Sequence, residues 1–336
     1  MKFGIIGSGS WATAIAKIIT DNHHPIHWWI RNRATIQSIQ QRHHNPHYLQ
    51  AASFNTSLLS MSDDIAQVIT NSDVLVVAVP SAFVKAAFEH LPKNIFQNKK
   101  IVSAIKGILP DCNDLLNEYL KKKFNVAIKN YFTLLGPCHA EEVAAEKLSY
   151  LTFSGIDEAA TATIAKHFNT PYLNTIINHD IIGVQYAAVL KNIYALGAGI
   201  AHGLQYGDNF ISVYIANCAN EMVVFLQKLV AQHEVPCNKE NIQYTSSVYL
   251  GDLLVTCYSL FSRNRTFGSM IGKGYSVKAA QLELNMIAEG YNAAQCVCIA
   301  NQKVGANIPI ITVIYQILWE QRAAREAFQQ IETLLV

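Results

Sequence analysis

The sequence predicts an α/β fold in which a doubly wound parallel sheet precedes a mainly α-helical domain. In the first half, short and continuously apolar runs alternate with helix-like segments, a pattern typical of parallel strands covered by helices on both faces. After about residue 178 the strand signals fade and long helical patterns take over. A length of 336 residues suits two domains. We therefore expect one domain at residues 1–178 and a second, all-helical domain at residues 179–336.

The first expected strand leads into a glycine-rich turn. The apolar run 3–6 suits a buried strand, and Gly7-Ser8-Gly9-Ser10-Trp11-Ala12 then opens a helical run. Gly7 permits a tight turn, Gly9 lets a pyrophosphate approach the backbone, and Ala12 keeps helix and strand close. The N-terminus of the helix attracts phosphate. An ordinary glycine turn is the alternative, but the flanking strand and helix favour a dinucleotide-binding domain of Rossmann type.

The remaining expected strands show where ligands should bind. In doubly wound sheets, ligands bind beyond the carboxyl ends of the strands. The residues at these ends are Pro80-Ser81, Lys106-Gly107 and Gly136-Pro137-Cys138. The strands themselves are expected at residues 26–30, 74–79, 101–105, 132–135 and 150–153.

The end of the second strand bears on the choice of cofactor. NAD sites usually place an Asp or Glu there, where it binds the ribose hydroxyls. Here the chain continues as Arg31-Asn32-Arg33, with no carboxylate. A guanidinium group can bind a 2′-phosphate with two hydrogen bonds and can stack on adenine. The sequence therefore favours NADP(H), with NAD(H) as the alternative cofactor and two solvated arginines as the simpler interpretation.

Composition and charge argue against several kinds of partner. A net charge of +2 gives no reason to expect a nucleic acid. Charges interrupt every long apolar run, so we expect no membrane insertion, and the first strand starts too close to Met1 for a signal peptide. The seven cysteines include no C-x-x-C pair, which is typical of a reduced, cytoplasmic protein. No metal site is expected, because the histidine clusters lack Cys or carboxylate partners at a known spacing: His23, His24 and His27, and His43, His44 and His47.

Two lysines are candidates for catalysis. Lys106 follows an expected strand, where a cation can meet an anionic substrate or a carbonyl oxygen, although a surface lysine is the simpler interpretation. Lys191 lies in an expected helix over residues 184–204 and shares a face with alanines, which suggests a cavity with room for a ligand. A partly desolvated lysine suits proton transfer, whereas the alternative is an amine that reaches water.

Polar residues after position 250 are candidates for substrate binding. Ser262-Arg263-Asn264-Arg265 combines guanidinium, amide and backbone groups that can bind a phosphate or carboxylate. A basic surface loop is the alternative. Asp252, ten residues earlier, is expected either to cap a helix or to be the carboxylate partner of a lysine.

Together these motifs resemble those of bacterial NAD(P)-dependent glycerol-3-phosphate dehydrogenases over essentially the whole chain. The resemblance implies a Rossmann domain followed by a helical domain like that of 6-phosphogluconate dehydrogenase. It also implies reversible reduction of dihydroxyacetone phosphate to sn-glycerol 3-phosphate. GPxxAEEVA, LKN and SRNRxFG in this order are far more specific than the glycine turn. The segments that carry the resemblance are GSGSWA (7–12), AIKGI (104–108), GPCHAEEVA (136–144), LKNIYALGAGIAHGL (190–204), GDN (207–209), GDL (251–253), SRNRTFG (262–268), GKG (272–274) and AEGYNAA (288–294).

The resemblance further implies roles for individual residues. Lys191 would be the proton donor and acceptor, Asp252 would orient Lys191 and the substrate hydroxyl, and Lys106 would contact substrate and nicotinamide. The implied substrate-binding residues are Lys106, Gly136, Cys138, Lys191, Asn192, Asp252, Ser262, Arg263 and Asn264. The implied cofactor contacts are Gly7, Gly9, Ser10, Trp11, Arg31, Lys106, Ala140, Arg263, Ile287 and Glu289.

One implied contact departs from the family pattern. Cys138 stands where Ser or Thr is more usual, and a thiol is a weaker hydrogen-bond donor than a hydroxyl. The side chain of Cys138 is therefore a weaker candidate for this contact, for which its backbone N–H can substitute.

Two other functions compete with this interpretation. One is a dehydrogenase of the same fold that acts on another small hydroxy acid, and the other is a non-catalytic NADPH-binding regulator. The joint presence of Lys106, Lys191 and Ser262-Arg263-Asn264 argues against both. The resemblance also implies a supply of glycerol 3-phosphate for phospholipid synthesis, and a homodimer is compatible with the helical domain.

Overall fold

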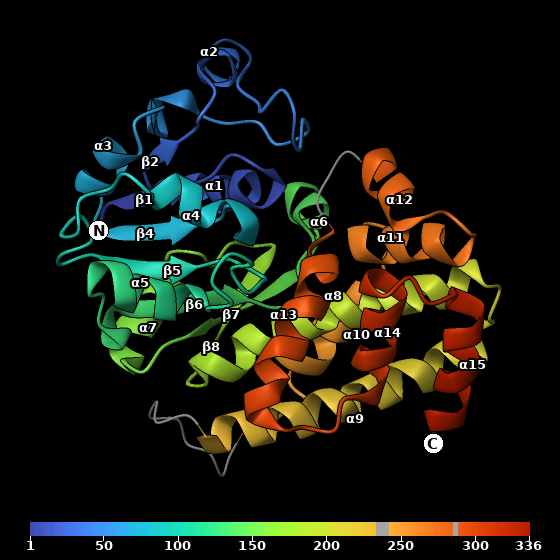
Figure 1. Ribbon diagram of the computed structural model, residues 1–336. Helices are drawn as coiled ribbons and strands as arrows, with labels where there is room; N and C mark the ends of the chain where they lie inside the picture. Colours follow the sequence, from blue (N-terminus) through green and yellow to red (C-terminus); the bar gives the residue numbers. More distant parts are fainter. Residues whose placement is uncertain (233–241, 285–287) are drawn as a thin grey trace. The chain divides into compact units, whose positions relative to one another are not determined.

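The computed structural model describes residues 1–232, 242–284 and 288–336, which form two compact units (Figure 1). The sheet unit comprises Met1–Ile105 and Asp114–Ile181, and the helical unit comprises Lys106–Asn113 and Ile182–Val336. The segment Lys106–Asn113 thus belongs with the helices, although it lies within the first 178 residues. Lys106 and Lys191 are therefore in the same unit.

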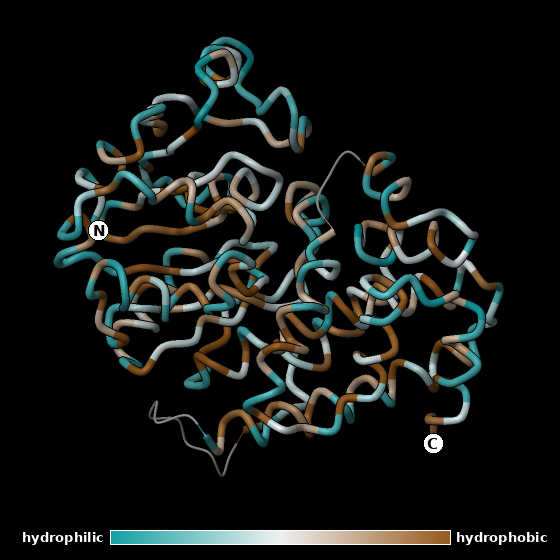
Figure 2. The backbone as a smooth tube through the Cα atoms, in the orientation of Figure 1, coloured by the Kyte–Doolittle hydropathy of each residue, from teal (hydrophilic) through white to brown (hydrophobic). Residues whose placement is uncertain are grey.

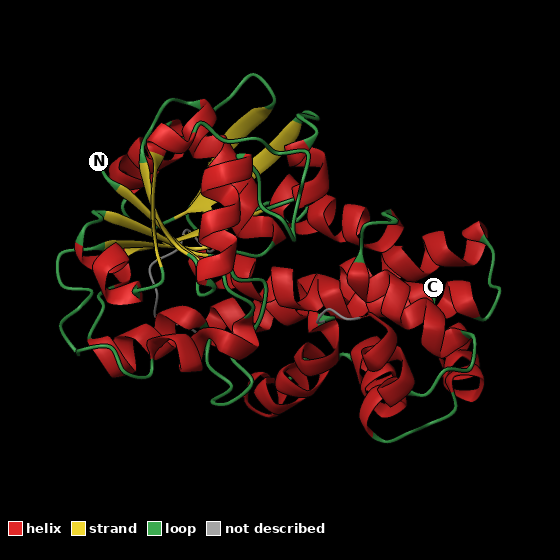
Figure 3. Ribbon diagram, turned by 90° about the horizontal axis from the view of Figure 1, so that it is seen from above, coloured by secondary structure: helices red, strands yellow, loops and turns green. Residues whose placement is uncertain are grey.

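Eight strands form one sheet in the sheet unit, with helices on both sides of it (Figure 3). The strand order is β3-β2-β1-β4-β5-β6-β7-β8, and all neighbours pair in parallel except β6 and β7. The order reverses between β1 and β4, which is where doubly wound sheets bind ligands. The strands are β1 (Phe3–Ile6), β2 (Ile26–Trp29), β3 (Leu59–Ser62), β4 (Val74–Val77), β5 (Lys100–Ser103), β6 (Tyr131–Leu135), β7 (Ser149–Ser154) and β8 (Leu173–Asn178).

The predicted α/β architecture is confirmed, but the sheet is not wholly parallel. β7 runs antiparallel to β6, with Leu135 opposite Thr152. The connection between these strands contains only the five-residue helix α6 (Ala140–Ala144). Such a short helix rises about 7.5 Å, less than half the length of the strand. The chain therefore re-enters the sheet from the end at which it left, which gives an antiparallel pair.

Two strands escaped prediction because they are not continuously apolar. β3 reads LSMS and is at one edge of the sheet, whereas β8 reads LNTIIN and is at the other. Both edge strands are largely half-buried. The central strand β4, by contrast, is buried throughout and is drawn in brown in Figure 2. Continuous hydrophobicity thus identifies central strands and misses edge strands.

The helices of the sheet unit begin where the sequence offers caps. Asn32, Asp64 and Asp157 accept backbone N–H groups at the starts of α2 (Arg33–Arg42), α3 (Ile65–Thr70) and α7 (Glu158–Lys166). α1, in contrast, begins without a side-chain cap. Besides α6, the helices are α1 (Ser10–Asp21), α2 (Arg33–Arg42), α3 (Ile65–Thr70), α4 (Val84–Phe88), α5 (Leu116–Phe124) and α7 (Glu158–Lys166).

The helical unit is built around α8 (Ile181–Gly203). By length and composition alone, α8 and α9 (Asp208–Gln232) are long and apolar enough to cross a membrane. The apolar part of α8 is entirely buried within the protein, as in a core helix, and 44 % of that of α9 is buried. The remaining helices are α9 (Asp208–Gln232), α10 (Asp252–Tyr258), α11 (Arg263–Gly272), α12 (Val277–Leu284), α13 (Glu289–Val304), α14 (Pro309–Trp319) and α15 (Ala324–Leu334).

Glycines let α8 and α11 pack backbone against backbone. A Cβ atom on Gly199 would lie 2.1 Å from the carbonyl oxygen of Arg265, and one on Gly268 would lie 1.9 Å from that of Leu196. Both distances are far shorter than a van der Waals contact, so any larger residue would push the helices apart. This packing holds the first turn of α11 beside the middle of α8.

Candidate active site

Lys191 on α8 and Asp252, the first residue of α10, form a buried ion pair in the helical unit. The ammonium nitrogen of Lys191 contacts Oδ1 of Asp252, and the two residues are only 3 % and 1 % exposed. Of the two sequence-based alternatives for Asp252, the structure shows the carboxylate partner of a lysine. Burying two charges costs free energy, so their retention in the core indicates a use beyond stability.

The second carboxylate oxygen of Asp252 is available to a bound molecule. It is buried, and it has no hydrogen-bond partner among the described residues. Because buried polar atoms are nearly always paired, a hydroxyl donor is the natural partner here. The surroundings are poorly solvated: burial raises the pKa of the nearby Cys257 thiol to about 12, although the charges of Lys191 and Arg265 oppose this shift. Charges act strongly in such a setting.

Two asparagines join the segments around Lys191. Nδ2 of Asn192 donates to the carbonyl oxygen of Lys106 at 3.1 Å, and Oδ1 of Asn192 accepts from Nδ2 of Asn264 at 2.9 Å. Oδ1 of Asn264 accepts from the backbone N–H of Gly290, near the start of α13, at 2.9 Å. These bonds hold Lys106, α8, α11 and α13 together. Both ends of the Asn192 amide are thus engaged by the protein itself.

The motif Ser262-Arg263-Asn264 forms the start of α11. Oγ of Ser262 accepts from the backbone N–H of Arg265 at 3.3 Å, so Ser262 is the N-cap. Arg263 is the first residue of the helix, is exposed, and has no ion-pair partner among the residues that the structure describes. A guanidinium group at the positive end of a helix is suited to a phosphate.

In the sheet unit, the predicted glycine turn joins β1 to α1. Gly7 has φ +124°, and a Cβ atom there would lie 2.7 Å from the carbonyl oxygen of Ala78. A Cβ atom on Gly9 would meet no atom within 4 Å, so the space above this residue is open. Ser10 and Trp11 are the first two residues of α1, whose first turn has no acidic residue. These features fit the pyrophosphate of a dinucleotide.

The two arginines after β2 have different surroundings. Nε of Arg33 lies 2.5 Å from Oδ2 of Asp63. Arg31 is exposed, and no ion pair involving it is found in the described part of the chain. Sequence reasoning missed Asp63 because it follows β3, a strand that was not predicted. Of the two arginines, Arg31 is therefore the better candidate for a 2′-phosphate.

Cys138 is engaged within the sheet unit. Its side chain is buried, and Sγ lies 3.3 Å from the carbonyl oxygen of Tyr150. Its backbone N–H donates to the carbonyl oxygen of Gly136 at 2.8 Å. Both donors of Cys138 thus have partners within the protein, and its contact with substrate stays a prediction. Gly136, with φ +132°, forms the turn after β6, and Ala140 is the first residue of α6.

The other predicted residues are placed as follows. Glu289 is the first residue of α13, whereas Ile287 lies outside the described residues. In the described part of the chain, no three His, Cys, Asp or Glu side chains form a group that could hold a metal ion.

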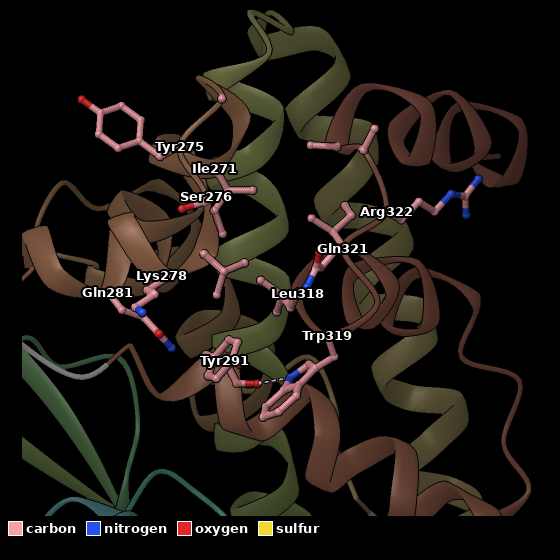
Figure 4. A pocket seen from close by; sticks show the side chains of 15 residues that line it. Ile271, Tyr275, Ser276, Lys278, Gln281, Tyr291, Leu318, Trp319, Gln321 and Arg322 are labelled. Atoms are coloured by element: carbon pink, nitrogen blue, oxygen red, sulfur yellow. Dashed lines mark hydrogen bonds between the residues drawn. The ribbon is translucent and has the colours of Figure 1, made fainter.

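A separate cavity of about 780 Å³ lies in the helical unit (Figure 4). Its lining includes Tyr291 and Trp319, whose rings stack 4.4 Å apart, and the indole N–H of Trp319 donates to the carbonyl oxygen of Tyr291. Lys278 and Gln281 of α12 lie on another side of it. None of the residues predicted for catalysis or binding lines this cavity.

Comparisons with known proteins decide the family. The model of the NAD-dependent glycerol-3-phosphate dehydrogenase N-terminus matches residues 2–161, and that of the C-terminus matches residues 180–329. A glycerol-3-phosphate dehydrogenase (NAD(P)+) from Thermoanaerobacter sp. strain X514 is 32 % identical to this chain, over 99 % of the chain and 97 % of the relative. The chain belongs to the NAD-dependent glycerol-3-phosphate dehydrogenase family.

Further members of the glycerol-3-phosphate dehydrogenase family agree with this assignment. The corresponding enzyme of Staphylococcus saprophyticus is 29 % identical over 98 % of this chain and 97 % of its own length. The crystal structure of a glycerol-3-phosphate dehydrogenase from Coxiella burnetii superposes with a TM-score of 0.87, at 25 % identity over 98 % of both chains. The family predicted from the motifs is confirmed, and the chain is an oxidoreductase of the NAD(P)-dependent glycerol-3-phosphate dehydrogenase class.

Proposed function

We propose that this protein catalyses the reversible reduction of dihydroxyacetone phosphate to sn-glycerol 3-phosphate, with Lys191 as the proton donor. The observation that carries the proposal is the buried ion pair of Lys191 and Asp252. The second carboxylate oxygen of Asp252 lacks a hydrogen-bond partner among the described residues. The nicotinamide, when bound, supplies the hydride that reduces the carbonyl carbon of the substrate.

Lys191 supplies the charge and the proton that this reduction needs. Its ammonium group lowers the energy of the developing alkoxide and donates a proton to the oxygen, and in the oxidation of glycerol 3-phosphate it accepts that proton. Asp252 holds the ammonium group in place and accepts a hydrogen bond from a substrate hydroxyl. Lys106, whose backbone is held by Asn192, adds positive charge on the substrate side.

The start of α11 supplies the phosphate site in this proposal. Arg263 is the residue that contacts the phosphate, because it is exposed and lacks an acidic partner in the described chain. Ser262 caps the helix, and Asn264 ties it to α8 and α13. The phosphate is remote from the reacting carbon, so its binding orients the ketone and lowers the barrier.

The sheet unit supplies the cofactor site. The open space at Gly9 and the uncapped start of α1 at Ser10 and Trp11 support binding of a pyrophosphate there. We assign the 2′-phosphate of NADPH to Arg31, which makes NADP(H) the favoured cofactor and NAD(H) the alternative. The remaining proposed contacts to cofactor or substrate are Gly7, Gly136, Cys138, Ala140, Lys106, Arg263, Ile287 and Glu289.

The proposal also assigns a task to each part of the chain. Residues 1–178 bind the dinucleotide, and residues 179–336 bind and reduce the substrate together with the segment Lys106–Asn113, which belongs to the helical unit. Family membership supports a homodimer, action in the cytoplasm, and a supply of glycerol 3-phosphate for phospholipid synthesis.

The test is NADPH oxidation, followed by absorbance, with dihydroxyacetone phosphate and with unphosphorylated dihydroxyacetone. NADH is run in parallel. Rapid oxidation with the phosphorylated ketone alone supports the reaction and the phosphate site together. Oxidation with another small keto acid instead supports a different dehydrogenase of this fold. Binding of NADPH by folded protein without turnover of any ketone supports a non-catalytic regulator.

A further inference from the structure

Three successive backbone carbonyls of the glycine turn face the interior of the sheet unit. The carbonyl oxygen of Gly7 accepts from Nε1 of Trp28 at 2.6 Å, and that of Ser8 accepts from Nδ2 of Asn45 at 3.1 Å. The carbonyl oxygen of Gly9 accepts from the backbone N–H and from Oγ1 of Thr13, at 2.9 and 3.0 Å. Every carbonyl between Gly7 and Gly9 therefore has a partner on the protein side.

The side chains that hold these carbonyls are built into the core. Trp28, Asn45 and Thr13 are all 0 % exposed. Nδ2 of Asn45 also donates to Oγ1 of Thr13 at 2.9 Å, so these two residues support each other. Oδ1 of Asn45 accepts from the backbone N–H of His47 at 3.0 Å, which fixes the amide in the orientation that directs its donors to the turn.

The orientation of the carbonyls determines the orientation of the amides. In a trans peptide unit, the C=O of one residue and the N–H of the next point in opposite directions. Because the carbonyls of Gly7, Ser8 and Gly9 point inward, the N–H groups of Ser8, Gly9 and Ser10 point outward. Outward is the open space in which a Cβ atom on Gly9 would meet nothing within 4 Å. Successive N–H groups arranged in this way form an anion-binding nest.

We propose that Trp28 and Asn45 are positioning residues that hold the glycine turn in its pyrophosphate-binding form through the carbonyls of Gly7 and Ser8. The proposal rests on the cofactor binding proposed above. Neither side chain touches the cofactor, and both act by fixing the peptide planes before the cofactor arrives. Preorganisation of this kind improves affinity because no ordering cost arises on binding. The residues thus act on the pyrophosphate and not on the adenosine half of the ligand.

The test compares two ligands that differ in the pyrophosphate. ADP-ribose contains it, whereas adenosine 2′-monophosphate does not, and calorimetry gives the dissociation constant of each. The variants are Trp28→Phe, which keeps an aromatic ring but removes the indole donor, and Asn45→Ala. Trp29→Phe is the matched control, because it removes an indole donor of the same strand that serves the carbonyl of Asp63 instead. Thr13→Val, which removes the hydroxyl that accepts a hydrogen bond from the Asn45 amide, replaces Asn45→Ala if that variant does not fold.

We expect the dissociation constant of ADP-ribose to rise about tenfold in Trp28→Phe and in Asn45→Ala, which corresponds to about 1.4 kcal/mol. That of adenosine 2′-monophosphate should change less than twofold, and Trp29→Phe should bind both ligands as the wild type does. Equal weakening of both ligands, or no weakening of either, overturns the positioning role. Failure of the wild type to bind ADP-ribose, NADPH and NADH overturns the proposed function itself, and the positioning role with it.

Discussion

The ammonium group of Lys191 and the carboxylate of Asp252 form an ion pair that is almost wholly buried in the helical unit. One of the two carboxylate oxygens faces the lysine, and the other has no partner among the described residues. A purely structural pair would be expected to satisfy both oxygens. The arrangement instead leaves an acceptor beside a proton donor, which is what the reduction of a hydroxyketone requires.

Replacing Asp252 should cost both activity and stability. Asp252→Asn leaves Lys191 buried without a counter-charge, so we expect kcat to fall by roughly 10²–10⁴-fold and the thermal midpoint to fall by several degrees. Removing one partner of a buried pair costs about 3–5 kcal/mol. Asp208→Asn, at an exposed position in the first turn of α9, is the control.

The double variant Lys191→Met/Asp252→Leu separates the two effects of that change. Because it removes both buried charges, it should recover much of the lost stability while staying inactive. Wild-type kcat in Asp252→Asn would show that the carboxylate has no part in turnover.

Replacing Arg263 should affect the phosphorylated substrate far more than the unphosphorylated one. A charge-assisted hydrogen bond contributes about 1.5–3 kcal/mol, so Arg263→Ala should lower kcat/KM for dihydroxyacetone phosphate by roughly 10- to 100-fold. The slow turnover of unphosphorylated dihydroxyacetone should fall much less, because this ketone loses only the proposed contact of Arg263 with the cofactor. Arg322→Ala serves as the control, because this arginine donates to Gln316 and Gln330 instead. An equal loss of kcat/KM with both ketones would show that Arg263 does not bind the phosphate.

Replacing Arg31 should reduce the preference for NADPH. Arg31→Ala should raise KM for NADPH by about tenfold or more and leave KM for NADH nearly unchanged, because only NADPH carries the 2′-phosphate. Arg33→Ala is the comparison, since Arg33 is already paired with Asp63 and should contribute less. Steady-state kinetics with both cofactors gives the result. A parallel rise for NADPH and NADH would contradict the assignment.

Glu221 should make stability depend on pH. This buried residue of α9 accepts from the backbone N–H groups of Ile310 and Ile311 at the start of α14 and from the hydroxyl of Tyr194. Burial raises the pKa of Glu221 to about 7, although these hydrogen bonds oppose the shift. The folded state therefore keeps the carboxyl proton of Glu221 to a higher pH than the unfolded state does. As the pH rises from about 4.5 to 7, the stability of the folded state should fall, and above pH 7 it should level off.

The size of this effect is on the order of 3 kcal/mol. The measurement is the thermal midpoint against pH for the wild type and for Glu221→Gln, which cannot ionise. The variant should be less stable at low pH and should lack this fall. Identical pH profiles for the two proteins would show that Glu221 does not titrate in this range.

Much of the fold could be predicted from the sequence because the central strands are continuously apolar. β1 and β4 are buried throughout, and the runs that form them stand out. The edge strands β3 and β8, which are partly exposed, lack this signal. The antiparallel pairing of β7 with β6 depends on the short connection between these strands, and hydrophobic patterning does not indicate how short it is.

The sequence identifies the candidate residues of the site more completely than the bonds that support them. Lys191 and Asp252 were identified as candidates, and the structure pairs them. The bonds of Asn192 to Lys106 and Asn264 join residues 72 to 86 positions apart, and no local pattern reveals such contacts. The same holds for Asn45, whose amide reaches the glycine turn from 37 residues away. Sequence motifs identify candidate groups for the chemistry, whereas the groups that position them emerge only from the fold.

The proposed mechanism depends on Lys191 as the donor of the proton. The most direct measurement is turnover of dihydroxyacetone phosphate with NADPH and with NADH by Lys191→Met, together with the dissociation constants of both cofactors by calorimetry. We expect kcat to fall by at least about 10²-fold while cofactor binding stays within about twofold of the wild type. Turnover close to that of the wild type, in a folded variant that binds cofactor normally, would contradict it.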